Sequence, residues 1–118
     1  MLVVARFRYN DAEDAGGAGD SGGPGVGRPM ADLGLCLDRL RTHPGFVSGS
    51  VGRALDDPGL WLLITSWRDV GSYRRALSSY EVKLQAVPLL SRAVDEPSAY
   101  EVVEPGTVLN IGSTRSLG

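Results

Sequence analysis

The chain has 118 residues, which is long enough for one compact core and too short for two ordinary domains. Its 12 basic and 14 acidic residues give a net charge of -2, so there is no cationic field to hold nucleic acid or an anionic membrane. We therefore expect a single domain over residues 1–118, with neither nucleic acid nor a membrane as its partner.

The cysteine content and the start of the chain indicate in which cellular compartment the protein works. The single cysteine, Cys36, excludes an internal disulfide and a cysteine pair at zinc-site spacing, and with one histidine no metal site is expected. The apolar run before Arg6 is too short for a signal sequence or a membrane span. These features favour a cytoplasmic protein.

The first third of the chain predicts a strand, a loop and a helix. Residues over Leu2–Tyr9 alternate in the period of a β-strand. Residues 10–28 hold seven glycines and four carboxylates, a composition typical of a flexible loop. Apolar residues then recur at helical spacing and predict a helix over 29–42, which Pro44 and Gly45 end.

The middle of the chain predicts a hairpin. Residues 46–55 form an extended run whose glycines indicate a bulge or a close backbone approach. The sequence Asp56-Asp57-Pro58-Gly59 strongly favours a β-turn, and an apolar strand over 60–67 follows it directly. The two runs therefore pair as antiparallel neighbours.

The last third predicts a broken helix and a short strand. Asp69 suits a helix N-cap, and Ser78-Ser79-Tyr80-Glu81 offers a capping box that restarts the helix at a new angle, with a break near Ser79. Pro88 either kinks or ends the second piece, which runs to about Leu90. Residues 99–103 predict a fourth strand, and residues 105–118 form a C-terminal tail that contains an extended arm.

The order strand, helix, strand, strand, helix, strand predicts an α+β fold of the ferredoxin-like, split βαβ type, with a four-stranded antiparallel sheet and helices on one face. The strand over 60–67 is apolar on both faces, although an antiparallel sheet with helices on one side normally keeps its other face polar. A second copy of the same sheet is the economical cover, so we expect a homodimer through sheet-to-sheet packing.

Three stretches carry a family resemblance. These are His43-Pro44-Gly45-Phe46-Val47-Ser48-Gly49, the strand residues Trp61-Leu62-Leu63 with Ser66-Trp67, and Tyr73-Arg74-Arg75-Ala76-Leu77-Ser78-Ser79. In this order they resemble the antibiotic biosynthesis monooxygenase domain family, which consists of small dimeric α/β barrels. The resemblance covers about residues 30 to 104 and implies the same dimeric α/β barrel here.

The resemblance also implies a site. Members that oxidise polycyclic phenols with O2, without metal or flavin, use a tryptophan and a tyrosine six residues apart, and Trp67 and Tyr73 match this spacing. We expect both as catalytic residues, because an indole N–H and a phenolic O–H can stabilise a substrate anion in a dry cavity. We expect no cofactor. We expect a small aromatic molecule and O2 as the partners.

Four further residues are expected to bind substrate, namely Phe7, Leu63, Tyr80 and His43. Leu63 stands where the phenol-oxidising members have an asparagine, four residues before the tryptophan. Tyr9 is another candidate donor, and an arginine among Arg68, Arg74 and Arg75 is a candidate to orient an anionic substrate.

Two other functions remain open from the sequence. A non-catalytic small-molecule-binding or stress-response dimer would keep the barrel without the full polar set, as Leu63 indicates. A haem-degrading oxygenase is disfavoured, because the positions of that branch's helical tryptophan and histidine fall on Ala76 and Ala86. A packing role for Trp67 and Tyr73, without chemistry, is the simplest alternative for that pair.

Overall fold

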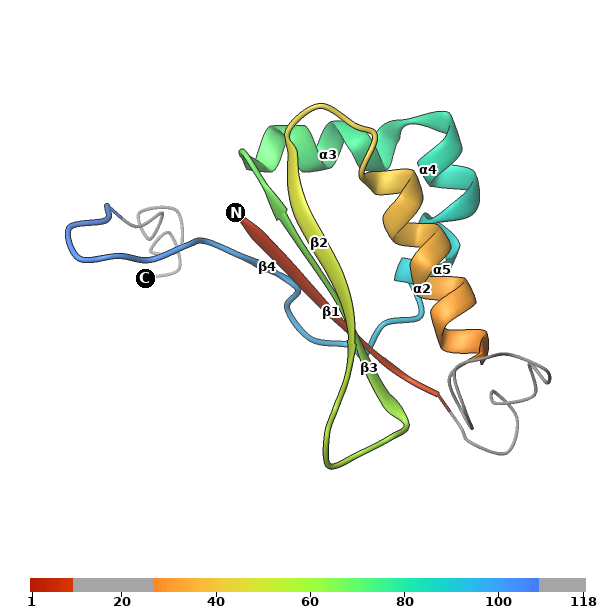
Figure 1. Ribbon diagram of the computed structural model, residues 1–118. Coiled ribbons are helices and arrows are strands. Elements are labelled where there is room, and N and C mark those ends of the chain that lie inside the picture. The colour runs from red at the N-terminus through yellow and green to blue at the C-terminus, as the bar shows by residue number, and fades with distance from the viewer. Residues whose placement is uncertain (10–26, 109–118) are drawn as a thin grey trace.

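The computed structural model describes residues 1–9 and 27–108 of the chain. These residues contain four strands and four helices (Figure 1). In chain order they are β1 (Leu2–Arg8), α2 (Gly27–Leu40), β2 (Phe46–Arg53), β3 (Leu60–Trp67), α3 (Val70–Ser78), α4 (Tyr80–Gln85), α5 (Val87–Leu90) and β4 (Ala99–Tyr100). The strands form one antiparallel sheet in the order β2-β3-β1-β4. The predicted ferredoxin-like α+β fold is confirmed.

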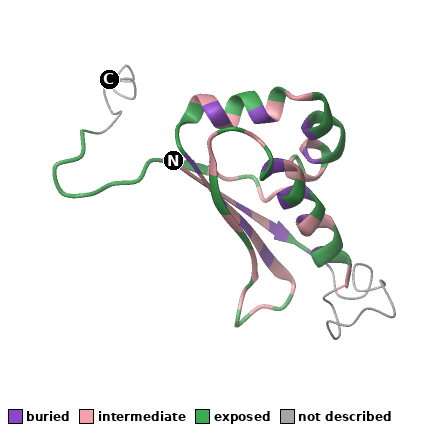
Figure 2. Ribbon diagram, turned by 45° about the horizontal axis from the view of Figure 1, so that its top comes forward, coloured by how far each residue is buried: buried purple, intermediate pink, exposed green. Residues whose placement is uncertain are grey.

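The helices lie on one face of the sheet, and the core lies between the two layers (Figure 1). Along β3 every second side chain is buried against the helices, and β1 alternates in the same way (Figure 2). The core residues of these strands are Val3, Ala5, Phe7, Trp61, Leu63, Thr65 and Trp67. None of the helices in the described ranges is long and apolar enough to cross a bilayer.

The ends of several elements differ from their predicted positions. Helix α2 begins at Gly27, inside the predicted loop 10–28, and residues 10–26 of that loop lie outside the described residues. The helix ends at Leu40 rather than at residue 42, because the chain turns through residues 41–45 into β2. Strand β2 ends at Arg53, because the Ala54 amide bonds to the Leu60 carbonyl at 2.9 Å and closes the hairpin.

The fourth strand is shorter than predicted. Strand β4 contains only Ala99 and Tyr100, which pair with Val3 and Leu2 at the start of β1. The remainder of the predicted strand, residues 101–103, is not part of the strand. Residues 105–108 of the predicted tail contain no helix or strand, and residues 109–118 lie outside the described residues.

The predicted break in the second helical region is confirmed at Ser79. Its extended backbone ends α3, and its hydroxyl accepts a hydrogen bond from the Val82 amide as the N-cap of α4. The same hydroxyl lies 3.3 Å from His43 Nε2. The connection between α2 and β2 therefore contacts the end of α3.

Gly45 lets the start of α3 approach that connection closely. Its φ angle is 92°, and a Cβ atom built there would lie 2.2 Å from the Ser72 hydroxyl oxygen. The Gly45 carbonyl also accepts a hydrogen bond of 2.7 Å from the Arg68 amide. A side chain at this position would be strained by both the backbone conformation and the contact.

We expect Gly45→Ala to lower the free energy of unfolding by about 1–3 kcal/mol, because it adds left-handed strain and a clash with Ser72. Gly34→Ala is the matched control, since Gly34 lies within α2 and a Cβ atom added there would meet nothing within 4 Å. The control should be more stable than the wild type by about 0.5–1 kcal/mol. Urea unfolding of both variants measures this, and equal stability of the two would contradict the account.

Candidate functional site

Trp67 lies at the end of β3 in the core, with 1% of its surface exposed. Its indole Nε1 donates a hydrogen bond of 2.9 Å to the Thr65 hydroxyl, two residues earlier on the same face of the strand. The edge of the Phe46 ring meets it at a centroid distance of 5.3 Å and an interplanar angle of 87°. A β-bulge between Phe46 and Ser48, and not at a glycine of the run, sets Phe46 opposite Trp67.

Tyr73 on α3 also packs against Trp67, at a centroid distance of 5.4 Å and an interplanar angle of 55°. We call Phe46, Trp67 and Tyr73 the aromatic triad. Tyr73 is half-buried, and its hydroxyl makes no hydrogen bond to any residue within 1–9 and 27–108. Burial, and to a smaller extent the nearby Cys36, raises the pKa of Tyr73, so its hydroxyl stays protonated at neutral pH and can donate.

Tyr73 also lines a groove of about 660 Å³ between α3 and the chain at and beyond β4. Its walls are mostly apolar, and four residues of α3 at helical spacing form one of them. The lining residues are Met1, Asp69, Val70, Tyr73, Arg74, Leu77, Ala99, Tyr100, Glu101 and Val102. We call this the Tyr73 groove, and its size lies in the range of small-molecule sites.

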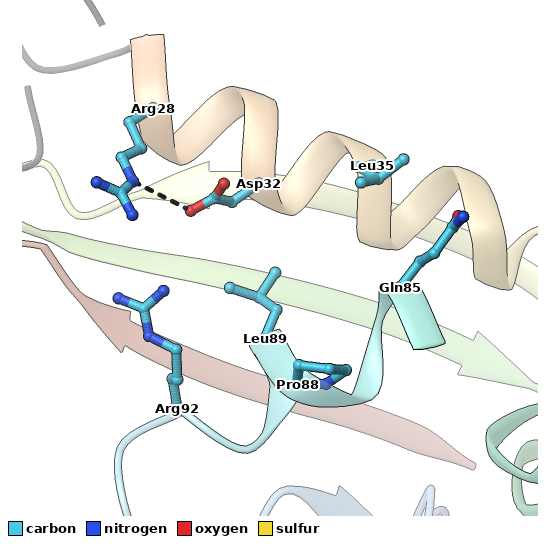
Figure 3. A pocket seen from close by; sticks show the side chains of 7 residues that line it. All are labelled: Arg28, Asp32, Leu35, Gln85, Pro88, Leu89 and Arg92. Carbon is cyan, nitrogen blue, oxygen red and sulfur yellow. Dashed lines mark ion pairs between the residues drawn. The ribbon is translucent and has the colours of Figure 1, made fainter. Parts of the chain in front are cut away.

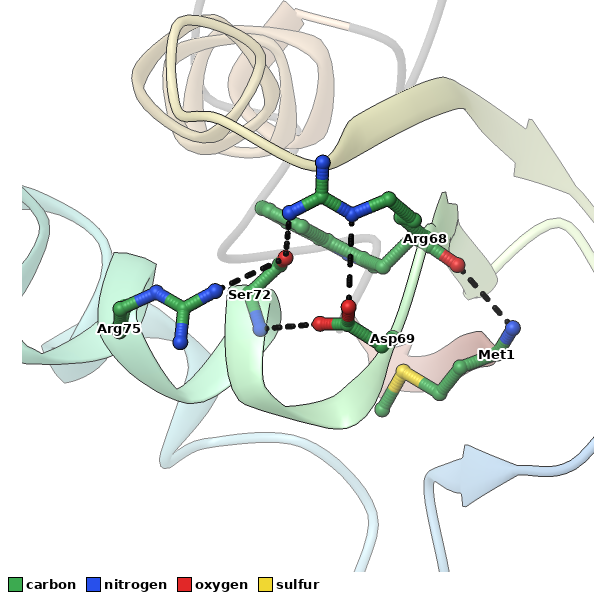
Figure 4. A network of polar contacts seen from close by, with 6 residues as sticks. Met1, Arg68, Asp69, Ser72 and Arg75 are labelled. Carbon is green, nitrogen blue, oxygen red and sulfur yellow. Dashed lines mark hydrogen bonds and ion pairs between the residues drawn. The ribbon is translucent and has the colours of Figure 1, made fainter.

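A polar network fixes the first turn of α3, which carries the groove wall (Figure 4). Asp69 is the N-cap predicted from the sequence, and its carboxylate accepts a hydrogen bond of 2.7 Å from the Ser72 amide. This bond, with smaller help from Arg68, holds the pKa of Asp69 below its usual range. The buried Ser72 hydroxyl in turn accepts from Arg68 and Arg75, each at 3.3 Å.

The other residues expected to bind substrate do not line the Tyr73 groove. Phe7 and Leu63 are each only 2% exposed and lie in the core below the helices. Tyr80 is 78% exposed on α4, and His43 contacts Ser79 at the junction of α3 and α4. The structure thus brings Trp67 and Tyr73 together and distributes the other four over the core, the surface and a helix junction.

Some groove residues could not be found from local sequence patterns. Met1 reaches the groove because its amino group bonds the Trp67 carbonyl at 3.1 Å (Figure 4). Tyr100 and Val102 form the opposite wall because β4 pairs with the start of β1. Their pairing joins residues that are almost 100 positions apart, so no local spacing could have indicated it.

Cys36 is fully buried on the inner face of α2. Burial raises the pKa of its thiol to about 12, so the thiol is protonated at neutral pH. A protonated, inaccessible thiol is a poor nucleophile. Cys36 therefore contributes packing to this region.

Thr65→Val should lower the free energy of unfolding by about 1–3 kcal/mol, because the buried indole N–H of Trp67 would lose its acceptor. Thr65→Ser keeps the acceptor oxygen and should cost less. Urea unfolding, monitored by tryptophan fluorescence, compares the two variants. If the valine variant were as stable as the serine variant, the bond would not hold the tryptophan.

Comparisons with known proteins agree with this architecture. Residues 32–84 match the family described as antibiotic biosynthesis monooxygenase. No curated protein matches the sequence. Among solved structures, a mutant of SnoaB, a cofactor-independent oxygenase from Streptomyces nogalater, is similar with a TM-score of 0.66 and 19% identity, over 87% of this chain and 92% of that one.

Two further structures show the same fold. Rv0793 from Mycobacterium tuberculosis is similar with a TM-score of 0.59 and 17% identity, over 90% of this chain and 97% of that one. A conserved protein from Methanosarcina mazei has a TM-score of 0.58 and 20% identity, over 83% of this chain and 84% of that one. Residues 32–84 are thus similar to the antibiotic biosynthesis monooxygenase family, and the described part of the chain shares the fold of these solved structures.

Proposed function

We propose that this protein is a monooxygenase that oxidises a phenolic or quinol-like aromatic molecule with O2, without a metal or an organic cofactor, in the Tyr73 groove. One observation carries the proposal. Tyr73 packs on the buried Trp67 and lines an apolar groove, and its hydroxyl makes no hydrogen bond to any described residue. SnoaB, a cofactor-independent oxygenase, has the same fold.

Tyr73 serves as a donor in this proposal and not as a base. Because its pKa is raised, the hydroxyl is neutral at pH 7 and can donate a hydrogen bond to the oxygen of a substrate phenolate. Arg74 lines the same groove, and its guanidinium makes no ion pair with any residue in the described ranges. Its positive charge would lower the pKa of a phenol that binds beside it.

The proposed reaction needs no external reductant. A phenolate-activated methylene group, as in an anthrone, gives up two hydrogens and gains a carbonyl oxygen, so that the methylene and O2 become a ketone and water. The substrate supplies the electrons, one oxygen atom enters the product and the other leaves as water. The protein's part is to bind the anion, orient it and exclude bulk water.

Trp67 supports the site by positioning Tyr73. Its indole N–H already donates to Thr65, so in this arrangement it is not available to a substrate oxygen. The ring instead forms the surface against which Tyr73 is held. The catalytic role expected for Trp67 becomes a positioning role in this proposal.

A second candidate function is binding without turnover. Leu63 is 2% exposed in the core, so the position of the family's asparagine offers no polar group to a substrate. The groove carries Tyr73 and Arg74, together with Tyr100 and the carboxylates of Asp69 and Glu101, and this set could hold an aromatic molecule without oxidising it. For haem degradation, Ala76 and Ala86 are 1% and 0% exposed and supply no ligand atom at the two matching positions.

Oxygen uptake with a panel of anthrones and hydroquinones tests the proposed activity. We expect Tyr73→Phe to lower kcat/KM by about 10²-fold, the loss typical of removing one donor to a developing oxyanion. Arg74→Gln should lower kcat/KM about tenfold. It should also shift the pH dependence of kcat/KM to higher pH, because the bound phenol would ionise less readily.

Tyr80→Phe is the matched control, since it removes an exposed hydroxyl outside the Tyr73 groove. It should leave uptake unchanged. Uptake that Tyr73→Phe and Arg74→Gln do not alter would refute the proposed roles. Saturable binding of these phenols without oxygen uptake would favour the second candidate function.

We also propose that the protein is a homodimer through the sheet face that carries no helices, which we call the open face. Leu60, Leu62 and Ile64 of β3 point to this face and remain half-exposed. Val4 of β1 lies directly beside Ile64, which makes the apolar strip continuous across two strands. A second copy of the open face would cover this strip under two-fold symmetry.

Ile64→Asp should convert a dimer into a monomer, because it would bury a charged carboxylate in the apolar strip of each copy. Leu84→Asp makes the same chemical change at a site on α4 that is 57% exposed, and it should leave the mass unchanged. Sedimentation equilibrium at micromolar concentration measures both. A wild-type mass of one chain would exclude the dimer.

A further inference from the structure

A separate pocket of about 230 Å³ lies between α2 and α5 on the helical side of the molecule (Figure 3). It shares no lining residue with the Tyr73 groove. Its floor is apolar, with Leu35 and Leu89, and its rim carries Arg28, Asp32 and Arg92. The function proposed above uses none of these residues.

Arg92 is the cation of this pocket that is open to a ligand. Asp32 is already engaged twice: it accepts a hydrogen bond of 3.1 Å from the buried Tyr9 hydroxyl, and it pairs with Arg28 Nε at 3.7 Å. Arg92 extends toward the same opening from the end of α5 (Figure 3), and no described residue forms an ion pair with it. Its guanidinium therefore faces the pocket without an ion-pair partner among residues 1–9 and 27–108.

The Tyr9 hydroxyl donates a hydrogen bond to Asp32, which lines this pocket. Burial and the charge of Asp32 raise the pKa of Tyr9, while Arg92 and Arg28 both act to lower it. The positive charge of Arg92 therefore acts on the buried Tyr9 hydroxyl, which donates a hydrogen bond to Asp32. Tyr9 and Asp32 also anchor the wall, because they join the end of β1 to α2.

We propose that this pocket binds a small amphiphilic monocarboxylate, with its carboxylate on Arg92 and its apolar body on Leu35 and Leu89. The single open guanidinium matches a singly charged group. A planar guanidinium can hold a carboxylate through two parallel hydrogen bonds, whereas the apolar floor would gain nothing from a bare inorganic anion. The site is independent of the proposed oxygenase activity.

Calorimetric titration of the full chain with benzoate, benzamide and inorganic phosphate tests this site. Benzoate should bind in a saturable manner, and at least about tenfold more tightly than either of the others, because only benzoate has both the charge and the apolar body. Absence of saturable benzoate binding would overturn the proposal. Equal affinity for benzamide would overturn the role of the arginine, and equal affinity for phosphate would overturn the role of the apolar floor.

Variants and NMR locate the binding. Arg92→Gln should weaken benzoate about tenfold, and Arg92→Lys should restore part of the loss. Arg41→Gln removes an exposed arginine that pairs with Asp38 near the other end of α2, and it should have no effect. Benzoate should shift the backbone amide signals of Asp32 and Arg92; shifts confined to α3 and β4, with no effect of Arg92→Gln, would place the ligand in the Tyr73 groove and refute the proposal.

Discussion

The structure around the site depends on one buried hydrogen bond, from the Trp67 indole N–H to the Thr65 hydroxyl. Trp67 is the largest side chain that the core encloses completely, and a buried N–H without an acceptor would cost about 1–3 kcal/mol. With its acceptor on the same strand, the indole ring has one favoured orientation. Phe46 packs against it through its edge and Tyr73 through a tilted contact, so the orientation of Trp67 constrains both β2 and α3.

The surrounding backbone is adapted to this ring cluster. Gly49 lies opposite Thr65 in the sheet, and a Cβ atom there would lie 2.4 Å from Leu37 Cδ1, so a side chain at this position would require Leu37 to move. Gly45 allows a similarly close approach of Ser72 at the start of α3. Tyr73 is therefore held from two sides, by the tryptophan below it and by the capped helix that carries it. A rigid tyrosine at the wall of an apolar groove is the arrangement that a donor to a substrate anion requires.

The sequence predicted those features that depend on local spacing. The alternation over β1 and β3, the turn at Asp57–Gly59, the Asp69 cap and the break at Ser79 each involve residues within a few positions of one another, and each is present. The groove could not be predicted in this way, because Met1 and Tyr100 join it through the pairing of β1 with β4. Leu63 and Phe7 were expected to bind substrate, Leu63 because the phenol-oxidising members have an asparagine at its position, but both side chains lie in the core.

The central claim is that Tyr73 presents a protonated hydroxyl to an aromatic ligand in the groove. NMR of the chain with ¹³C at tyrosine Cζ tests it directly, with the Tyr73 signal identified by its loss in Tyr73→Phe. On titration with an anthrone or hydroquinone under nitrogen, the account predicts that the Cζ signal of Tyr73 moves in a saturable manner and keeps the shift range of a neutral phenol. The exposed Tyr80 should stay in place. A Tyr73 signal that does not move while the ligand saturates the protein would contradict the account.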